Sequence, residues 1–458
     1  MKKKVAVIGS GISGLSISYF LSKNYEVDLY ESADYIGGHT NTVDVDEDGK
    51  KIPIDTGFIV FNHQTYPNLL KLFHHLDVPT KKSNMSFSVQ NEKTGLEFCG
   101  SGLNGLFAQR KNLLSLSYIR FLLEIDRFNK ESIKILEDPK YKSYTLGQYM
   151  KEENFNERML SDYLVPMSSA VWSTPPDQML QFPARTLVRF FYNHGFLGLN
   201  TQHQWYTVDG GSREYVRRII KPFEKNIHLK SPVLAVETKG KKVEITLKSK
   251  KVLSYDKVIL ASHGDTALKL LKKPSKLQKE VLSEFKFQPN TATLHTYEGD
   301  MPKIKSTWSS WNYKYGRQGN EIVSPVSSSS SKSKANSKSN ASPSSKPSLS
   351  VSKKEELVPF TVYWMNRLQD VSKKKNYFVT INDPDRIPKQ DIIRKIQYDH
   401  PLFSMGSVQA QERFADLNSE SNIHFVGAYF RYGFHEDGIE SSVRLAELIL
   451  GENPWLSL

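Results

Sequence analysis

The sequence predicts an α/β protein, and three observations lead to this prediction. A short apolar run over Val5–Ile8 is followed by a glycine-rich turn and then by apolar residues at helical spacing up to Leu21. The segment Glu26–Tyr30 alternates between polar and apolar residues, as strands do. Strand and helix patterns return together over His424–Val426 and about Gly438–Leu450. A strand, a helix and a second strand within about 30 residues are typical of a parallel sheet covered by helices.

Composition limits the class of protein and its compartment. The chain has 458 residues, of which 38% are hydrophobic and 24% charged, so it is globular and long enough for two or three domains. Cys99 is the single cysteine, which excludes an intrachain disulfide and a multi-cysteine metal site and fits the cytoplasm. No His and carboxylate spacing suggests a metal, and no run approaches the ~18 apolar residues needed to span a bilayer. We interpret Lys2–Lys4 as the start of the first strand, not as part of a signal peptide.

The net charge of +13 suggests that the protein binds nucleic acid, but the distribution of the charge along the sequence weakens this interpretation. Lys2–Lys4 contribute three charges, and the segment Ser324–Ser352 contributes four lysines without an acid. About +6 remains for the rest of the chain, with no nucleic-acid-binding motif, so we expect no nucleic-acid partner. About half of Ser324–Ser352 is serine, and it has no acidic or aromatic residue, so we predict a disordered insertion in a loop.

Further patterns predict the elements between the two ends. Apolar residues at helical spacing predict helices from about Leu103 to Leu136, and an aromatic-rich helix is expected from about Thr186 to Leu199. Three apolar runs predict further strands, at Val233–Val236, Val243–Leu247 and Val258–Ala261.

The turn after the first strand carries the strongest motif. Its residues form the pattern G-x-G-x-x-G, which are Gly9, Ser10, Gly11, Ile12, Ser13 and Gly14. The first glycine permits a tight turn, the second lets the backbone approach a pyrophosphate, and the third lets helix and strand pack closely. The following helix N-terminus favours phosphate oxygens. Glu31 ends the second strand, where its carboxylate can accept from a ribose 2′-hydroxyl. These features predict a Rossmann-type dinucleotide site.

A glycine pair and four further segments resemble the flavin-containing amine-oxidase superfamily. The pair is Gly37-Gly38, followed by His39 where relatives often carry arginine. The resemblance implies FAD as the cofactor and an α/β fold of amine-oxidase and glutathione-reductase type. It also implies cofactor-binding roles for residues in or directly after the segments Gly38–His39, Ile54–Phe58, Ser231–Val236, Phe425–Tyr429 and Gly433–Gly438. These residues are Gly38, His39, Asp55, Gly57, Val233, Gly427, Gly438 and Ile439.

The resemblance narrows to a group of predicted NAD/FAD-binding proteins associated with cyclopropane-fatty-acyl-phospholipid synthases. It rests on Gly37–Thr42, Met301-Pro302, Trp308–Tyr313, Tyr363–Gln369, His400–Phe403 and Gly433–Gly438. It implies an FAD-binding domain of residues 1–60, 204–265 and 405–458 and an interleaved α+β substrate domain of residues 61–203 and 266–404, with 324–352 as the insertion. It also implies a lipid-modifying enzyme as a partner.

Candidate catalytic groups fall in two places. His435 and Glu436 precede the last helix, and two roles are open for them. They face the flavin or the substrate, or they cap the helix. Asp437 is well suited to the capping role. Aromatic residues flank the insertion on two expected strands and form either a substrate wall or plain core; they are Trp308, Trp311, Tyr313, Tyr363 and Trp364. In many relatives a lysine near the flavin holds a water, and Lys303 and Lys305 are candidates for it.

We therefore expect an FAD-dependent oxidoreductase that transfers hydride from an apolar or acyl-lipid-like substrate to flavin N5. The alternatives are an amine oxidase proper and a non-catalytic FAD-binding partner of a lipid-modifying enzyme. A small-molecule or lipid substrate is expected in each catalytic case. Apolar faces of the expected helices at Leu103–Leu136 and of the stretch Phe190–Tyr192 suggest either a peripheral membrane contact or packing on the substrate domain. The basic residues beside them are Arg110, Lys111, Arg120 and Arg189.

Overall fold

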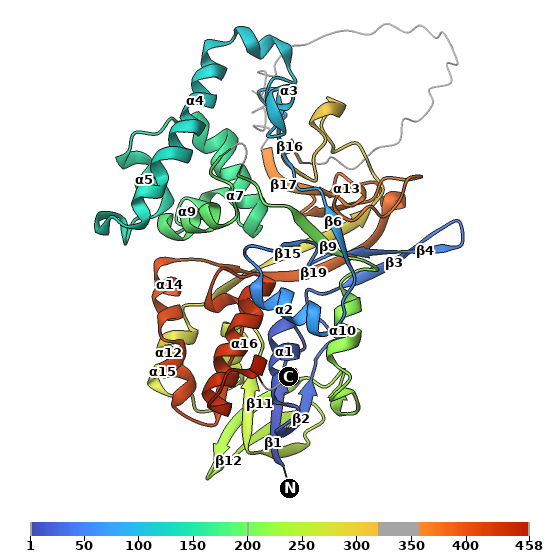
Figure 1. Ribbon diagram of the computed structural model, residues 1–458, viewed down its shortest axis with the longest axis vertical. Helices are drawn as coiled ribbons and strands as arrows, with labels where there is room; N and C mark the ends of the chain where they lie inside the picture. The colour runs from blue at the N-terminus through green and yellow to red at the C-terminus, as the bar shows by residue number, and fades with distance from the viewer. Residues whose placement is uncertain (1, 199–200, 319–356, 457–458) are drawn as a thin grey trace, which may run out of the picture.

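The computed structural model describes residues 2–198, 201–318 and 357–456 (Figure 1). In Figure 1 a lower part holds both ends of the chain, and an upper part is built from the middle of the chain. The predicted insertion Ser324–Ser352 lies outside the described residues. Among the described helices, none has the length and apolar character that crossing a bilayer requires.

A parallel sheet forms the centre of the lower part. Its strand order is β10-β2-β1-β14-β20, and every neighbouring pair is parallel. The strands are β1 (Lys3–Ile8), β2 (Tyr25–Tyr30), β10 (Ile227–His228), β14 (Lys257–Leu260) and β20 (Ile423–Phe425). Central strands of a parallel sheet are buried on both faces, which accounts for the continuous apolar runs Val5–Ile8 in β1 and Val258–Leu260 in β14. Strands β1 and β2 come from the start of the sequence, β10 and β14 from its middle and β20 from near its end, so the sheet is complete only when all three segments meet.

Helices and small sheets cover this centre. Helix α1 (Ile12–Leu21) is buried along its whole length and packs against the last helix, α16 (His435–Leu450). The other elements of the lower part are α10 (Arg213–Ile219), α11 (Gly264–Leu270), α12 (Lys276–Leu282), α14 (Met405–Glu412), α15 (Phe414–Ser419) and the antiparallel sheet of β11 (Val233–Lys239), β12 (Lys242–Leu247) and β13 (Val252–Tyr255).

A mixed sheet of seven strands separates the lower part from the helices above it. Its order is β19-β15-β18-β17-β16-β7-β8, antiparallel except for the pair β16 and β7. The strands are β7 (Phe87–Asn91), β8 (Leu96–Cys99), β15 (Lys286–His295), β16 (Trp311–Arg317), β17 (Leu357–Trp364), β18 (Phe378–Ile381) and β19 (Ile392–Leu402), with α13 (Met365–Gln369) after β17.

Shorter elements connect the two parts. They are the hairpin β3 (Thr42–Glu47) and β4 (Lys50–Asp55), the sheet of β5 (Phe61–Asn62), β9 (Trp205–Val208) and β6 (Thr80–Ser83), and helix α2 (Pro67–His75).

Helices from the middle of the chain form the top of the molecule in Figure 1. They are α3 (Gly102–Leu106), η1 (Arg110–Leu114), α4 (Leu116–Glu131), η2 (Ser132–Leu136), α5 (Leu146–Glu152), α6 (Glu157–Met159), α7 (Val165–Trp172), α8 (Pro176–Met179) and α9 (Ala184–Asn193). They pack around a second apolar core that includes Tyr118, Phe121 and Phe191.

Two expected elements differ from the structure. The helix expected to reach Leu199 ends at Asn193, because Gly195 adopts φ +69°, a left-handed conformation that stops a helix. Trp308 was expected on a strand, but it follows a short turn of 3-10 helix, η6 (Lys305–Thr307), and precedes β16. The segments 1–60, 204–265 and 405–458 supply all strands of the parallel sheet, and the domain boundaries themselves stay a prediction.

Candidate functional site

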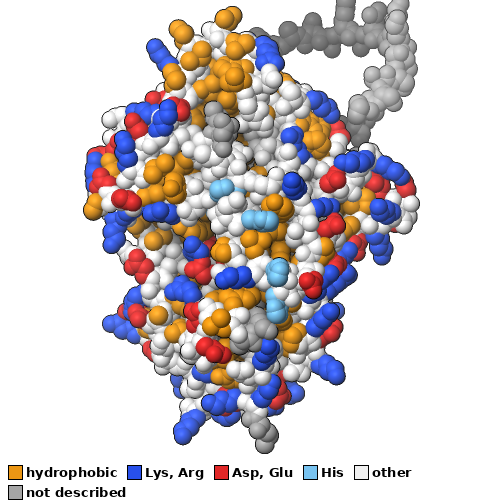
Figure 2. Space-filling model, viewed as in Figure 1, with side chains coloured by type: hydrophobic (Ala, Val, Ile, Leu, Met, Phe, Trp, Pro, Cys, Tyr) orange, Lys and Arg blue, Asp and Glu red, His pale blue; other side chains and the backbone are white. Residues whose placement is uncertain are grey.

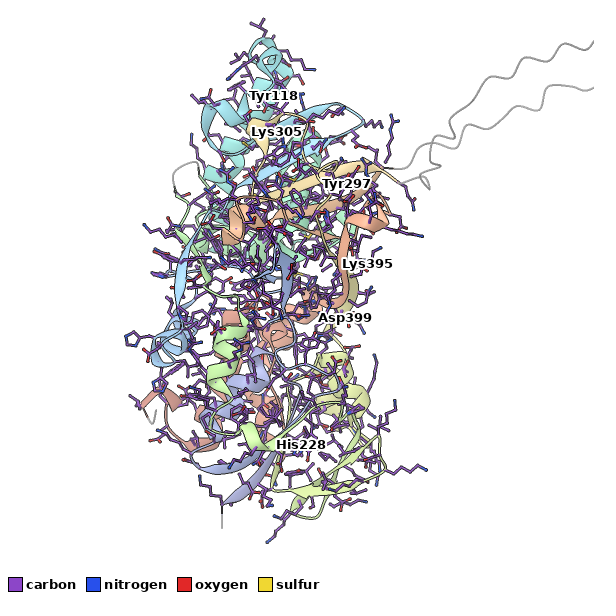
Figure 3. All side chains as sticks on the ribbon, turned by 90° about the vertical axis from the view of Figure 1, so that its right-hand side faces the viewer. Tyr118, His228, Tyr297, Lys305, Lys395 and Asp399 are labelled. Atoms are coloured by element: carbon purple, nitrogen blue, oxygen red, sulfur yellow. The ribbon has the colours of Figure 1, made fainter. Side chains whose placement is uncertain are left out.

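A cavity of about 510 Å³ runs from the glycine-rich turn after β1 to a group of aromatic side chains. Its first end is lined by Gly9, Ser10, Gly11, Ile12, Ser13, Glu31 and Ser32, and its other end by Ile59, Val60, Met85, Val171, Trp172, Phe190, Phe196, Trp205, Trp311, Tyr363, Tyr432 and Phe434. Between them lie His39, Gly57, Phe58, Asp399, His400, Gly427 and His435. Figure 3 shows Asp399 at the middle height of the molecule, above His228 of the lower part.

The glycine-rich turn leaves room for a ligand at one position only. Gly9 has φ +105°, and a Cβ on Gly14 would lie 1.9 Å from the Gly9 carbonyl oxygen, so neither position accepts a side chain. A Cβ on Gly11 would meet no atom within 4 Å. Gly11 lines the cavity at the N-terminus of α1, where unpaired N–H groups favour phosphate oxygens. The empty space beside Gly11 therefore fits a pyrophosphate group.

Glu31 already holds the turn in place. Its Oε2 accepts from the Ser10 backbone N–H at 2.9 Å and from the Ser10 hydroxyl at 2.6 Å, while Oε1 accepts from the Ala33 N–H. Glu31 also lines the cavity. The Ser32 hydroxyl donates to Oε1 as well, at 3.1 Å, so a ribose hydroxyl that donates to this carboxylate would take the place of one of four present donors. The carboxylate thus links the end of β2 to the phosphate-binding turn.

His39 is one of four described cavity-lining residues with a buried polar atom that lacks a hydrogen-bond partner, together with Trp205, Trp311 and Tyr429. The Nε2 of His39 has no hydrogen-bond partner, although the atom is buried at the cavity. Burial lowers the pKa of His39 well below 6.5, as do the nearby His400, His263 and His435, so the ring is neutral at pH 7. Its ring stacks on Tyr398 at a centroid distance of 4.7 Å. His39 can donate a hydrogen bond to a ligand, but it does not supply the permanent positive charge of an arginine.

The neighbouring glycines bring backbone segments together at this point. A Cβ on Gly38 would lie 3.1 Å from Gly11 Cα, and a Cβ on Gly57 would lie 2.3 Å from the His39 carbonyl oxygen. Asp55 lies close by but does not line the cavity. Its fully buried carboxylate accepts from Thr42, Ser212 and Gln369, and burial raises its pKa. Asp55 therefore positions the chain that leads to Gly57, and its own contact with the cofactor stays a prediction.

The N-terminus of α16 forms one wall of the cavity. His435 lies there with its ring stacked on Phe58 at 3.8 Å, and its Nε2 hydrogen-bonds with Thr40 Oγ1 at 3.0 Å and with the Tyr215 hydroxyl at 3.2 Å. Burial lowers the pKa of His435 to about 3, so it is neutral at pH 7. Gly438 lets α16 approach α1, because a Cβ there would lie 2.7 Å from Ile12 Cγ2.

Glu436 and Asp437 are turned away from the cavity. Glu436 caps α2, since its carboxylate accepts from the backbone N–H groups of Asn68 at 3.0 Å and Leu69 at 2.9 Å. Asp437 accepts from the Phe434 N–H at 2.8 Å and so caps its own helix, and burial raises its pKa to about 8. Neither residue lines the cavity, so the structure gives the capping interpretation for both.

The aromatic residues that flank the insertion separate into two groups. Trp311 and Tyr363 face each other across β16 and β17 and line the cavity. Trp308 and Trp364 pack together in a separate apolar cluster, and Tyr313 is buried without lining the cavity. Lys303 and Lys305 do not line it either, and Lys305 lies over the Trp308 ring.

Three of the predicted cofactor residues differ in whether they line the cavity. Val233 begins β11 and Ile439 is fully buried in α16, and neither lines the cavity, whereas Gly427 does. The sequence patterns missed most of the aromatic end. Trp172, Phe190 and Phe434 come from α7, α9 and the turn before α16, and an aromatic residue in a helix is also typical of core.

Comparisons with known proteins agree with this geometry. A family model described as flavin containing amine oxidoreductase matches residues 12–450. A double mutant of putrescine oxidase has a similar structure, with a TM-score of 0.66 and 13% identity, over 99% of this chain and 100% of that one. A fatty acid isomerase from P. acnes that produces CLA gives a TM-score of 0.60 and 11% identity, over 98% of each chain. The structural matches show the fold, and the predicted α/β fold is confirmed.

One curated protein is similar in sequence over a short region. The zeta-carotene desaturase of Zea mays is 43% identical over 72 residues, which are 16% of this chain. The match spans 12% of the length of that desaturase, so it covers only a small part of that protein.

Proposed function

The chain belongs to the flavin-containing amine oxidoreductase family, and we propose that within this family it oxidises an apolar, acyl-lipid-like substrate. Its cofactor is FAD, as the glycine motif and its flanking strands predict. When bound, FAD supplies the redox chemistry by accepting a hydride at N5. The proposal concerns which substrate this chain brings to the flavin.

The residues at the first end of the cavity fit a dinucleotide. We propose that the N–H groups at the start of α1 bind the pyrophosphate beside Gly11, and that Glu31 accepts from a ribose hydroxyl. The neutral ring of His39 would donate from Nε2, its unpaired atom. With little fixed cationic charge from His39, backbone N–H groups carry most of the phosphate recognition.

At the aromatic end, the residues orient the substrate and exclude water. His435 is held by Thr40 and Tyr215 and stacked on Phe58, so its ring has one fixed orientation in the cavity wall. Because its pKa is about 3, we assign it a positioning role and not proton transfer near neutral pH. Trp311 and Tyr363 form the wall that would contact an apolar chain.

The observation that carries the proposal is the distribution of charge around the cavity. Among the described lining residues the carboxylates are Glu31, which follows β2, and Asp399, on β19. Asp399 is half-exposed and lies 3.9 Å from His263, and no carboxylate lines the aromatic end in the part of the chain that the structure describes. A buried ammonium needs a charged or strongly polar partner, whereas an acyl chain needs only apolar walls. The aromatic end therefore favours an apolar substrate.

Two relatives lend support through what their names state. One is a fatty acid isomerase of the same fold, and the other is a carotene desaturase with a short similar region. The amine-oxidase alternative rests on the shared fold of putrescine oxidase and on the indole faces of Trp172 and Trp311, because aromatic faces attract cations.

Anaerobic reduction of the bound flavin tests the proposal. The yellow holoenzyme is mixed with phospholipids and fatty acids of differing saturation and, separately, with putrescine and cyclohexylamine. We expect loss of the visible flavin absorption with one lipid class and none with amines. Reduction by amines alone overturns the lipid proposal, and full FAD content without reduction by any donor points to a non-catalytic partner of a lipid-modifying enzyme.

A matched pair of variants links the reduction to this cavity. Trp311→Ala removes a lining side chain and should lower kcat/KM for the active lipid by about 10- to 100-fold, since it removes substrate contacts. Trp308→Ala removes the same side chain three positions earlier, outside the cavity, and should leave kcat/KM unchanged. The visible spectrum of bound FAD reports on correct folding in both.

A further inference from the structure

The top of the molecule carries an exposed apolar patch, which we call the apical patch. It consists of Leu103 in α3, Leu113 and Leu114 in η1, and Leu116, Ile119 and Leu123 in α4, whose exposed fractions are 72%, 50%, 92%, 75%, 37% and 61%. Figure 2 shows apolar side chains gathered at the top of the molecule, with basic side chains on both sides. Single exposed leucines are ordinary, but six exposed aliphatic residues within 21 positions are not.

Helix α4 explains why these residues are exposed. Tyr118, Phe121 and Phe128 point inward and are almost fully buried in the upper core. The opposite face, which a surface helix normally fills with polar residues, carries Leu116, Ile119 and Leu123 instead. The apolar residues on the inward face are buried within the molecule, whereas those on the outward face are exposed and are free to bind an apolar partner.

The patch is held in a defined shape. The Tyr118 hydroxyl donates to the Leu106 carbonyl oxygen at 2.6 Å and ties α4 to α3. The Ser115 hydroxyl caps α4 by accepting from the Tyr118 N–H. Figure 3 shows Tyr118 near the upper end of the molecule, below the outermost residues. The exposed Leu113, Leu114 and Leu116 therefore lie on or directly after a turn that hydrogen bonds hold in place between α3 and α4.

The charged side chains within the patch segment itself have one sign, whereas the acidic Glu124 and Asp126 that follow it form ion pairs with Arg127 and Lys130. Residues 101–123 contain three basic residues, Arg110, Lys111 and Arg120, and no acidic residue. All three are exposed, and none forms an ion pair with a carboxylate among the residues that the structure describes. Exposed cations beside an apolar face complement a surface with anionic groups above an apolar interior.

We propose that the apical patch inserts into the surface of a lipid bilayer that contains anionic phospholipids. The leucines would enter the boundary between head groups and acyl chains, and the three cations would contact phosphate groups. This is a monotopic contact, because no described helix suits a bilayer span. The inference does not rest on the substrate proposal, since it concerns a surface at the far end of the upper helices.

Vesicle flotation of the full-length holoenzyme tests the contact. We expect the enzyme to float with vesicles of phosphatidylcholine and phosphatidylglycerol, more weakly with phosphatidylcholine alone, and less at high salt. The triple variant L113Q/L114Q/L116Q should abolish flotation. The variant R110Q/K111Q/R120Q should lower the partition coefficient for anionic vesicles by about 100-fold, because three cations near the surface are removed.

Matched controls separate the patch from general surface properties. L234Q/L448Q/L456Q replaces three leucines that are at least half exposed elsewhere, and K221Q/K225Q/K241Q removes three exposed cations of the lower part. Both should float like the unmodified enzyme, and flavin absorption should be unchanged in all four variants. Absence of flotation, or equal flotation of patch and control variants, overturns the proposal. Light scattering that shows a dimer dissociated by L113Q/L114Q/L116Q overturns it in favour of a second copy.

Discussion

Replacement of Gly11 by alanine separates cofactor binding from folding. Gly11 has φ −64° and ψ 176°, an extended conformation that alanine adopts without strain. A Cβ there meets no protein atom within 4 Å. We therefore expect the FAD-free variant to be as stable as the unmodified protein, or more stable by up to about 1 kcal/mol, since alanine has less freedom in the unfolded chain.

The same methyl group should weaken FAD binding strongly. If the pyrophosphate lies beside Gly11, the methyl group separates the phosphate oxygens from the N–H groups at the start of α1. The loss of two hydrogen bonds to a charged group costs about 1.5–3 kcal/mol each. A total of about 3–6 kcal/mol corresponds to a dissociation constant at least 100-fold higher.

Titration of FAD-free protein with FAD, followed by flavin fluorescence, measures this constant, and urea unfolding measures stability. Gly100→Ala is the matched control, because a Cβ at this exposed position also meets nothing within 4 Å and Gly100 does not line the cavity. A Gly11→Ala protein that binds FAD within threefold of the unmodified protein would refute the placement of the pyrophosphate. Equal weakening by Gly100→Ala would show that the effect is not local.

Other changes have equally definite outcomes. Glu436→Gln should lower the free energy of unfolding in urea by about 1–2 kcal/mol, because one of two backbone N–H groups of α2 loses its charged acceptor. The rate of flavin reduction should stay the same. A large drop in that rate would return Glu436 to the catalytic candidates. Asp55→Ala should cost about 3–5 kcal/mol, since it leaves several buried donors unpaired, and a loss below 1 kcal/mol would contradict the buried network. Acid should weaken the FAD-free protein: His435 has a folded pKa of about 3 against an ordinary 6.5, so below pH 6.5 the unfolded chain binds a proton that the folded chain does not. The stability contribution is complete above pH 6.5 and is lost as the pH falls toward 3, by about 2 kcal/mol at pH 5. His435→Gln should lose about 2 kcal/mol less than the unmodified protein between pH 7 and pH 5, and an identical loss in both would show that His435 titrates normally.

The dinucleotide turn was readable from the sequence because its constraints are local. Gly9 has a φ of +105°, Gly14 must leave room for the Gly9 carbonyl oxygen, and Glu31 directly follows the very next strand. Only the close approach of these two glycines to Ala261 is remote in the sequence. The role of Glu436 could not be predicted from the sequence, because the first backbone N–H group that it accepts from, that of Asn68, lies 368 residues earlier in the chain. Nothing in the segment around Glu436 distinguishes a carboxylate that caps a remote helix from one that faces a ligand.

The aromatic end was only partly predictable for a related reason. Trp308 and Trp311 are three residues apart, yet one packs against Trp364 and the other lines the cavity. Trp308 directly follows the short turn at Lys305–Thr307, whereas Trp311 begins β16, and no periodic pattern in the sequence marks this change. The described residues that complete this end come from helices and turns over most of the chain length, so only the fold brings them together.

The packing of α16 against α1 sets an order of events during synthesis. Ser442 donates to the Ser13 carbonyl oxygen, and Gly438 lies against Ile12, so the first helix of the chain is completed by the last. The ribosome releases α1 long before it synthesises α16 and β20. In the meantime the surface of α1 that later contacts α16, and the edge of β14 that later pairs with β20, stay exposed in the nascent chain. We therefore expect that only a chain translated to the end of α16 retains FAD. A chain that stops before His435 should contain no bound flavin and should bind chaperones more strongly than the complete chain.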